Sequence, residues 1–469
     1  MSDRLHPNVT LAILSASGVA YAVLSSAVIP ALPVIQHSLH TSETGVAWLL
    51  TGYLLSASVG TAIIGRLGDM FGKERVLVWT LVVLGVGTAL AGIADSLALL
   101  IVARVVQGVA GGIFPLSFGI VRDEFPRDKV AGGIGLISAI LGVGGGVGIV
   151  AGGLIAEHLS WHWLFWMPLV VIVPAAFCTW RFVPESPVRV PGRINWGAAA
   201  LMSAGISLAL VAVSETTTWG WGSARTIGVL VAGLVLCAVW VVVETRSSVP
   251  LIDMAMMRIR GVWTTNATAF LLGAGMYSSF IVFPQFAQLP KSTGFGFGAS
   301  VVQSGLYLLP STILMAVVGT FAGRIAARFG SKHATVAGSA FTALSFGFLA
   351  AQHTHPYDML ISAAFLGIGI GLAFAALGNL IVESVRPEQT GAAGGMNTVM
   401  RTIGGALGGQ LAATFIADHH TSAGVPTVTG FTDSFLLATG FLVVCTLTAL
   451  LVPSRRAAPG LVDAEAVEA

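Results

Sequence analysis

Charged residues are scarce in this chain. Only 9% of its 469 residues are charged, whereas 55% are hydrophobic and the mean hydropathy is +0.87. Soluble globular domains carry about 25% charged residues, so this composition excludes one. The hydrophobic residues come in long blocks, and about 20 consecutive apolar residues are enough to span a bilayer as a helix. The net charge of +2 gives no reason to expect a nucleic-acid partner.

Cysteine and nucleotide-binding motifs are also lacking. The three cysteines, Cys178, Cys237 and Cys445, all lie in apolar blocks, which argues against disulfides and against a metal site. No phosphate-binding loop of the form Gly-x-x-x-x-Gly-Lys-Ser/Thr is present, so an ion or substrate gradient is the expected energy source and no cofactor is expected. The apolar block after Arg4 runs on without a small-residue cleavage site, so we interpret it as a first span rather than a signal peptide.

The apolar blocks predict fourteen membrane-spanning helices, with twelve as the alternative. The fourteen cover residues 9–34, 45–65, 76–94, 97–121, 130–155, 163–183, 194–214, 226–243, 262–288, 302–326, 334–351, 357–382, 391–417 and 434–452. Of the 23 Lys and Arg residues, nineteen fall on the side of the termini, two on the opposite side, and two (Arg104 and Arg401) within helices. Because cytoplasmic loops retain basic residues, both termini are predicted to be cytoplasmic. The preference for arginine over lysine, with abundant Ala, Gly and Val, indicates a bacterial plasma membrane.

One short loop occurs twice. The stretch GRLGDMFGKERVLVWT begins at Gly65 and returns as GRIAARFGSKHATVAG at Gly323. Both copies run the same way across the membrane, so the repeat is parallel, and a cleft between two like halves suits alternating access. The predicted fold is therefore an all-α integral membrane protein with an N-terminal six-helix bundle (1–193), two inserted helices and a linker (194–261), a C-terminal six-helix bundle (262–452) and a disordered cytoplasmic tail (453–469). The inserted helices are expected at the periphery.

Several motifs together resemble one family. GRLGDMFGKER resembles the signature loop of the major facilitator superfamily, and RVVQGVAGG, from Arg104, is similar to its helix 4 motif. GVGGGVGIVAGG, from Gly142, occupies the place of the antiporter motif. WLLTGYLL, from Trp48, and MNTVMRTIGGALGG, from Met396, resemble the fourteen-helix drug:proton antiporter branch. The resemblance covers most of the chain and implies a multidrug exporter that works by antiport.

The resemblance also implies a latch between the two halves. Asp69 would engage the N-terminus of helix 391–417 and a neighbouring arginine, and would hold an outward-closed state. Alternatively, Asp69 only caps the helix that follows it. The second copy has Ala327 at this position, so the latch would be one-sided. The predicted latch loop consists of Gly65, Arg66, Asp69, Gly72, Lys73 and Arg75.

A second set of residues is predicted to serve coupling or gating. An arginine inside a bilayer is costly and indicates a functional site, although Arg104 and Arg401 could instead be satisfied by backbone carbonyls and by Gln107 or Asn397. In the antiporter position the chain has Ile149 where the family has proline, so plain packing remains as open as gating for the glycines. The set comprises Arg104, Gln107, Gly108, Gly148, Gly152, Gly153 and Glu157.

The predicted substrate cavity is apolar with few polar groups, as hydrophobic ligands require, although each lining residue could instead serve helix packing. None of the 21 carboxylates falls in the middle third of a predicted span. A cavity with arginines and no acidic partner is expected to disfavour cations and to accept neutral or anionic compounds. The usual proton carrier is then missing, so coupling would use Asp69 or Glu157, or would not involve protons. The candidates are Trp48, Tyr53, Met276, Tyr277, Phe280, Phe374, Asn379, Asn397 and Arg401.

The sequence therefore predicts a secondary transporter that exports small hydrophobic compounds, driven by a proton gradient. The alternative is a dedicated exporter or importer of a single neutral or anionic metabolite. A membrane enzyme or sensor would need catalytic groups inside the spans or a soluble output domain, and neither is visible. The expected partners are a small-molecule substrate and the lipid bilayer, with no obligatory protein partner and a monomeric state.

Overall fold

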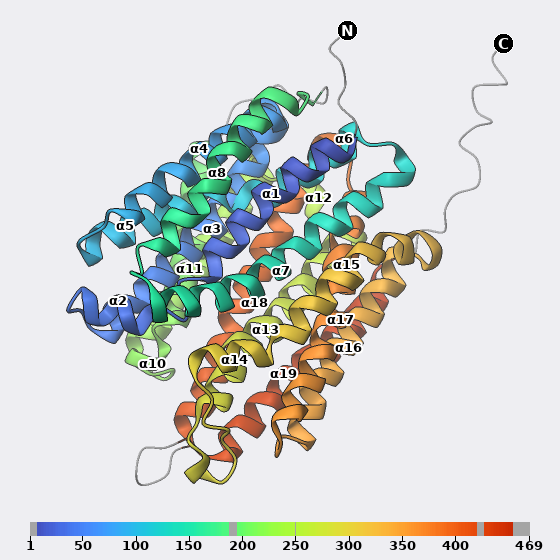
Figure 1. The fold of residues 1–469 in the computed structure, drawn as a ribbon. Helices are drawn as coiled ribbons and strands as arrows, with labels where there is room; N and C mark the ends of the chain where they lie inside the picture. The colour runs from blue at the N-terminus through green and yellow to red at the C-terminus, as the bar shows by residue number, and fades with distance from the viewer. Residues whose placement is uncertain (1–6, 187–194, 249, 420–425, 454–469) are drawn as a thin grey trace, which may run out of the picture.

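The computed structural model describes residues 7–186, 195–248, 250–419 and 426–453. These residues form a bundle of long helices that cross the molecule side by side (Figure 1). The start of α1 (Pro7–Ser26) and the end of α19 (Val428–Leu451) lie at the same end, at the top of Figure 1. We call this the termini end and the opposite one the far end.

The N-terminal half contains six crossings. After α1 and the short α2 (Leu32–Ser38), the chain forms α3 (Glu43–Phe71), α4 (Lys73–Gly92), α5 (Leu97–Gly108) with α6 (Ile113–Glu124), α7 (Arg127–His158) and α8 (Trp163–Phe182). A 3-10 turn, η1 (Val109–Gly112), joins α5 to α6 within one crossing. The first predicted span is too long, because the chain leaves the helix after Ser26 and α2 restarts at Leu32. Pro30 and Pro33 account for the break, since proline cannot continue the hydrogen-bond ladder of a helix.

The C-terminal half also contains six crossings. They are α13 (Arg260–Gln288), α14 (Val301–Tyr307) with α15 (Leu309–Phe329), α16 (Ser331–Ala351), α17 (Pro356–Ser384), α18 (Thr390–Asp418) and α19. The predicted span 302–326 is one crossing in two pieces, because the helix breaks at Leu308, just before Pro310. Short 3-10 turns, η2 (Lys291–Thr293) and η3 (Pro387–Gln389), precede α14 and α18.

Thirteen helices of the described residues are long and apolar enough to cross a membrane. The remaining crossing is α18, whose 29 residues include many glycines and two strongly polar side chains, Asn397 and Arg401. α18 lies between the halves, packed against α3, α13 and α19, so it needs less apolar surface than a helix that faces lipid. The predicted all-α membrane fold is confirmed.

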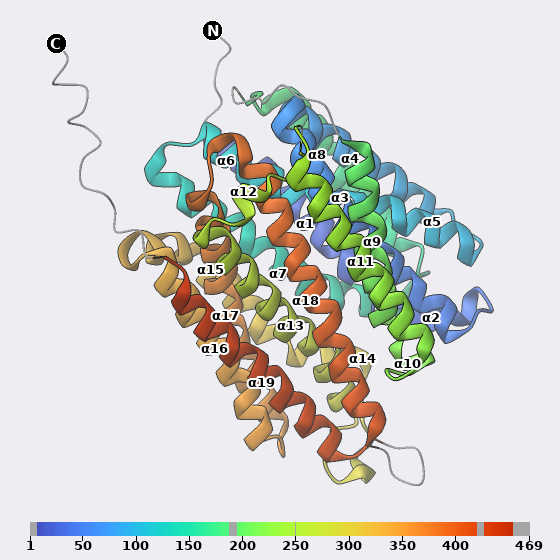
Figure 2. The same ribbon diagram turned by 180° about the vertical axis from the view of Figure 1, so that it is seen from behind.

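The inserted helices lie beside the contact between the halves. α9 (Trp196–Ser214) and α11 (Ala224–Arg246) pack together where Gly205 and Gly233 bring their backbones close. α10 (Thr216–Trp219) joins them at the far end, and α12 (Met254–Met257) follows at the termini end. α9 contacts both α3 and α18, whereas most of α11 is exposed, and Figure 2 shows the pair on one flank of α18. The domain boundaries remain a prediction, and residues 187–193 and 454–469 lie outside the described residues.

Candidate functional site

Asp69 joins the two halves. It lies in the last turn of α3 and is 1% exposed. One carboxylate oxygen accepts a hydrogen bond from the Gly391 N–H at 3.1 Å and the other from the Ala392 N–H at 3.0 Å. These amides belong to the first turn of α18, whose unpaired N–H groups favour a negative charge. The side chain does not cap α4, which begins after Gly72 without a side-chain cap.

Glycine makes this contact possible. A Cβ atom on Gly65 would overlap the carbonyl oxygen of Gly391, and a Cβ atom on Gly391 would overlap that of Gly65. α3 and α18 therefore touch backbone to backbone, which places Asp69 within reach of the α18 amides. Gly72 forms the turn that follows, with a φ of 106° that glycine adopts at no steric cost.

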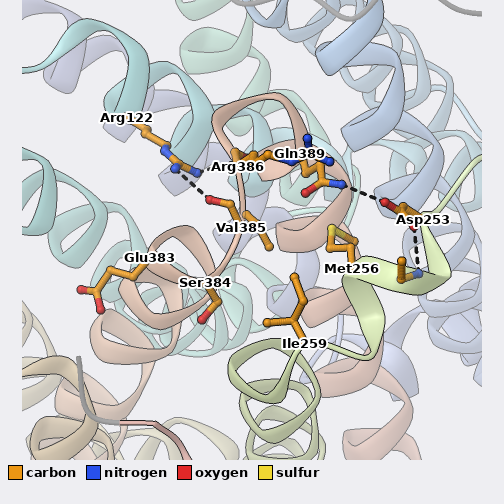
Figure 3. A pocket seen from close by; sticks show the side chains of 10 residues that line it. Arg122, Asp253, Met256, Ile259, Glu383, Ser384, Val385, Arg386 and Gln389 are labelled. Atoms are coloured by element: carbon orange, nitrogen blue, oxygen red, sulfur yellow. Dashed lines mark hydrogen bonds between the residues drawn. The ribbon is translucent and has the colours of Figure 1, made fainter. Parts of the chain in front are cut away.

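A second bridge between the halves comes from Arg122, in the last turn of α6. Its guanidinium donates to the Val385 carbonyl at 2.9 Å (Figure 3) and to the Thr390 hydroxyl at 2.6 Å. Arg122 is thus an arginine near Asp69 that bonds the segment leading into α18. From its sequence position Arg122 is predicted only to be one of the basic residues on the side of the termini, because that position does not show which helix the side chain faces.

Of the other charged residues of the predicted latch, Lys73 and Arg75 bond within their own half, whereas Arg66 shares a pocket with residues of the linker and of the C-terminal half. The Lys73 ammonium forms a buried salt bridge of 2.5 Å with Asp123, which also accepts a hydrogen bond from Ser186. The Arg75 side chain is largely exposed and lies 3.5 Å from the Glu185 carboxylate. Arg66 lines a pocket of about 310 Å³ at the termini end. Lys73 and Arg75 hold the loop in place within its own half, whereas Gly65 and Asp69 contact α18.

The repeated loop makes the matching contact without a carboxylate. A Cβ atom on Gly323 of α15 would overlap the backbone of Gly132 in α7, so these helices also touch directly. The side chain of Ala327 lies outside the described residues. Beside this contact the Asn379 amide donates to the Ala131 carbonyl at 3.4 Å. Asn379 was predicted to line the cavity; its side chain is buried between α17 and α7, a helix of the other half, near the termini end.

Both contacts close the same end of the molecule. The last turn of α3 and the first turn of α18 lie at the termini end, as does the Gly323–Gly132 contact (Figure 1). The resemblance implied an outward-closed state. In the predicted orientation the termini end is cytoplasmic. A latch at this end would close the cytoplasmic side rather than the outer side, unlike the outward-closed state that the resemblance implies.

A pocket of about 410 Å³ lies beside the latch (Figure 3). Within it the Gln389 amide donates at 3.0 Å to Asp253, whose other oxygen caps α12. The linker from the inserted helices is thereby tied to the turn before α18. The residues that line this pocket are Arg122, Asp253, Ala255, Met256, Ile259, Glu383, Ser384, Val385, Arg386 and Gln389.

The glycines of α7 seat two different helices. A Cβ atom on Gly148 would come within 2.6 Å of the Val23 carbonyl, and one on Gly152 would overlap Ala27, so both face α1. Gly142 and Gly146 face Met315 and Thr312 of the α14–α15 crossing instead. Gly153 is buried as well. α7 therefore lies tightly between α1 in its own half and α15 in the other, and close packing accounts for these glycines.

This packing gives a matched prediction. Gly148→Ala should reduce the amount of folded protein in the membrane, because the added methyl group must push α1 away from α7. Gly145→Ala, three residues earlier, should have no effect, because nothing lies within 4 Å of its Cβ position. Thermal unfolding of the two purified variants in detergent would check this. Equal unfolding temperatures would contradict the assignment of Gly148 to packing.

The Arg104 guanidinium is fully buried and held by three helices. It donates to the carbonyls of Leu24 in α1 and Leu49 in α3, both at 3.2 Å, and to the Gln107 side chain at 2.8 Å. It also lies over the Tyr53 ring, 4.1 Å from its centre. Three of its N–H groups are thus bonded as the structural alternative expects, whereas Nη2 has no hydrogen-bond partner among the described residues.

The rest of the helix 4 motif adds to the same cross-link. The Gln107 amide donates to Thr88 of α4 at 3.3 Å. A Cβ atom on Gly108 would come within 2.9 Å of the Ala57 backbone nitrogen in α3. Arg104, Gln107 and Gly108, all on α5, therefore join this helix to α1, α3 and α4 of the same half.

Aromatic rings connect this cross-link to the centre of the molecule. The Tyr21 ring of α1 lies 6.0 Å from that of Tyr53 and 5.9 Å from that of Phe114. From the other half, Tyr277 of α13 packs against Gly405 of α18. Tyr21 was not among the predicted residues. The scarcity of tyrosine, with five in the chain, is the signal that could have indicated it.

Arg401 completes the central group. Its guanidinium lies over the Phe374 ring of α17, 4.7 Å from the ring centre. Tyr277 of α13 lies one helical turn further along α18, against Gly405. From the other half, α3, which carries Tyr53, packs against α18. Residues of both halves therefore face one another here. We call Tyr21, Tyr53, Tyr277, Phe374 and Arg401 the central cluster.

The remaining predicted residues lie elsewhere. Asn397 is buried between α18 and α13, where its amide donates to Asn266 at 3.0 Å. Met276 is buried beside a narrow crevice between α7 and α15. Trp48 is partly exposed near the start of α3, and Glu157 is exposed in the last turn of α7 at the far end. The side chain of Phe280 lies outside the described residues.

Comparison with known proteins decides the family. The sequence profile of the Major Facilitator Superfamily matches residues 14–409 and again residues 265–467. The chain belongs to this superfamily. The double match agrees with the repeated loop, because the second one begins near the start of α13.

Several relatives are named for export or for drug resistance. The chain is 29% identical over 412 residues to the tetracenomycin C resistance and export protein of Streptomyces glaucescens, which covers 86% of this chain and 76% of that protein. It is 28% identical over 370 residues to multidrug resistance protein 3 of Bacillus subtilis, covering 77% and 70%. It is 29% identical over 447 residues to the cephamycin export protein CmcT of Amycolatopsis lactamdurans, covering 93% and 90%.

A solved structure shares the fold. The human organic anion transporter MFSD10 superimposes with a TM-score of 0.69 at 14% identity, over 94% of this chain and 99% of that one. At this identity the likeness shows the architecture alone. The facilitator protein is thus a multi-pass membrane transporter with two related halves.

Proposed function

We propose that this facilitator protein exports small hydrophobic compounds, such as drugs or antibiotics, across the bacterial plasma membrane in exchange for protons. The observation that carries the proposal is the bond from Asp69 to the first turn of α18, at a contact between the halves. Relatives of 28–29% identity named as antibiotic export and multidrug resistance proteins support the direction and the substrate class.

Alternating access would use the two helix contacts at the termini end. In the present conformation α3 meets α18 and α15 meets α7 through glycine, so the two halves are in backbone contact at the termini end. Opening the termini end requires both contacts to separate. Because a ligand or proton shifts such an equilibrium only by binding one state better than the other, a group that belongs to the contact itself is the natural place for coupling.

Asp69 is the carboxylate we assign to proton coupling. The other buried carboxylates of the described residues are bonded elsewhere: Glu74 to Glu185, Asp123 to Lys73, Glu244 to the backbone of Leu251, and Asp358 to the start of its own helix. Only Asp69 among these bonds to the opposite half. A proton on Asp69 would remove the negative charge that the α18 amides favour and would weaken the latch. Glu157 is exposed at the far end and has no such contact.

A flux assay in proteoliposomes tests the proposal. The purified full-length protein would be reconstituted with a trapped pH indicator, and an imposed pH gradient would drive transport of ethidium, Nile red or either of two unrelated dye carboxylates, a coumarin and a pyrene. Gradient-dependent movement of at least two dyes, with proton movement in the opposite direction, is the expected result. Transport without proton movement would overturn the antiport, and transport of a single compound would favour the dedicated metabolite carrier.

A further inference from the structure

The two arginines inside the membrane-spanning helices are held very differently. Arg104 has hydrogen bonds to two carbonyls and a side-chain amide, besides the ring of Tyr53. Arg401 has the Phe374 ring, and within the described part of the chain no hydrogen bond or ion pair holds its guanidinium. Its side chain also remains partly exposed, whereas that of Arg104 is 0% exposed.

A guanidinium without an anionic partner is unfavourable at this depth. Arg401 is the twelfth residue of α18, which places it roughly 17 Å along a helix of 29 residues. Charged side chains at the middle of a membrane are costly unless they pair, and they mark ligand or ion pathways. The buried carboxylates of the described residues are bonded close to helix ends, away from the middle of α18 where Arg401 lies.

The surroundings of Arg401 resemble a binding site more than a structural joint. The rings of Phe374 and Tyr277 come from α17 and α13, and α3, which carries Tyr53, packs against α18 from the other half. Aromatic walls with one charged group and a few hydroxyls are typical of sites for small amphipathic ligands. A guanidinium also offers a planar fork of donors that fits a carboxylate or a phosphate in two places.

We propose that Arg401 binds an anionic group of the exported compound, while the rings of the central cluster contact its apolar part. The inference rests on the proposed function in one respect, namely that the compound is the transported substrate. It narrows the substrate class to hydrophobic compounds that carry a carboxylate or a similar anion. Cationic dyes would be disfavoured, because no negative side chain faces the guanidinium.

Binding to the purified full-length protein tests the inference apart from transport. The probes are one coumarin dye in two forms, its carboxylate and its neutral carboxamide, which differ little in shape. The wild type should bind the carboxylate at least about tenfold more tightly, as expected for a charge-assisted contact away from bulk water. Arg401→Ala should remove this preference and leave carboxamide binding within about twofold, and Arg401→Lys should keep part of it.

Arg328→Ala is the matched control. Arg328 also lies over a phenylalanine ring, 5.4 Å from that of Phe329, but it is exposed at the end of α15. Removing it takes away a positive charge and a ring contact far from the central cluster, so the carboxylate preference should persist. A salt-dependent loss in this variant as well would assign the preference to the net charge of the protein rather than to Arg401.

The inference fails if the wild type binds the two dyes equally or binds neither. It also fails if Arg401→Ala weakens both dyes alike, because that result indicates a packing role. Preserved carboxylate binding with no export in proteoliposomes would count against the proposed function and leave the binding site standing. Export of the carboxamide alone would support the function and overturn the anion site.

Discussion

Asp69→Asn should reduce export at least about tenfold while the protein remains folded in the membrane. The substitution keeps the shape of the side chain but removes its charge and turns one acceptor into a donor. That donor would face a backbone N–H at one of the two latch positions, where Asp69 is buried and now accepts at 3.0–3.1 Å. A buried donor without a partner costs about 1–3 kcal/mol, enough to move a balanced equilibrium by up to about a hundredfold. The latched state would be depopulated.

The population shift can be measured directly. Met396 lies on α18 just behind the latch and is 3% exposed. A cysteine at this position, in a background without Cys178, Cys237 and Cys445, should react slowly with a membrane-impermeant maleimide. Asp69→Asn should raise the rate of reaction from the termini side. Glu388→Gln is the control, because Glu388 is exposed in η3 beside the latch. Unchanged export and unchanged labelling in Asp69→Asn would remove Asp69 from the mechanism.

The sequence predicts the fold well because helices in a bilayer leave strong local signals. Apolar blocks of sufficient length and the distribution of basic residues are properties of short segments, and they are read without knowing any tertiary contact. The span edges were wrong where proline breaks a helix. Pro30 and Pro33 split the first span, and Pro310 follows the break at Leu308. These prolines were visible, but hydropathy alone joins the two sides of each break.

The site was harder to predict because the deciding helices have no polar face. α17 is buried almost all round between Gly367 and Val382, so the pattern of its residues does not show which side chain faces the centre. Phe374 and Asn379 therefore looked alike as candidates, although one lies under Arg401 and the other bonds α7 near the termini end. The bridging role of Arg122 was not predicted for a similar reason, since a basic residue at a helix end is expected on the cytoplasmic side whether or not it bridges the halves.

The two membrane arginines also looked alike in the sequence. Each stands within an apolar block near glycines and an amide side chain, and both alternatives, ligand contact and structural joint, applied to each. The neighbours that separate them come from other helices: Leu24 and Leu49 for Arg104, and Phe374 for Arg401. Sequence spacing carries no information about contacts of this length along the chain.

Arg104→Ala should therefore fail in folding rather than in transport alone. Its removal leaves the carbonyls of Leu24 and Leu49 and the Gln107 oxygen without this donor in a site that is 0% exposed. A buried acceptor left without its donor costs about 1–3 kcal/mol, and three acceptors lose a donor here. We expect a membrane abundance far below wild type and an unfolding temperature in detergent lower by several degrees.

Arg104→Lys should recover little, because a single ammonium cannot reproduce the fork that spans α1 and α3. Arg401→Ala, measured alongside, should keep wild-type abundance, since no hydrogen bond of the described chain depends on it. If Arg104→Ala accumulates normally and unfolds at the wild-type temperature but does not export, Arg104 acts in substrate binding or coupling, and the distinction drawn between the two arginines is wrong.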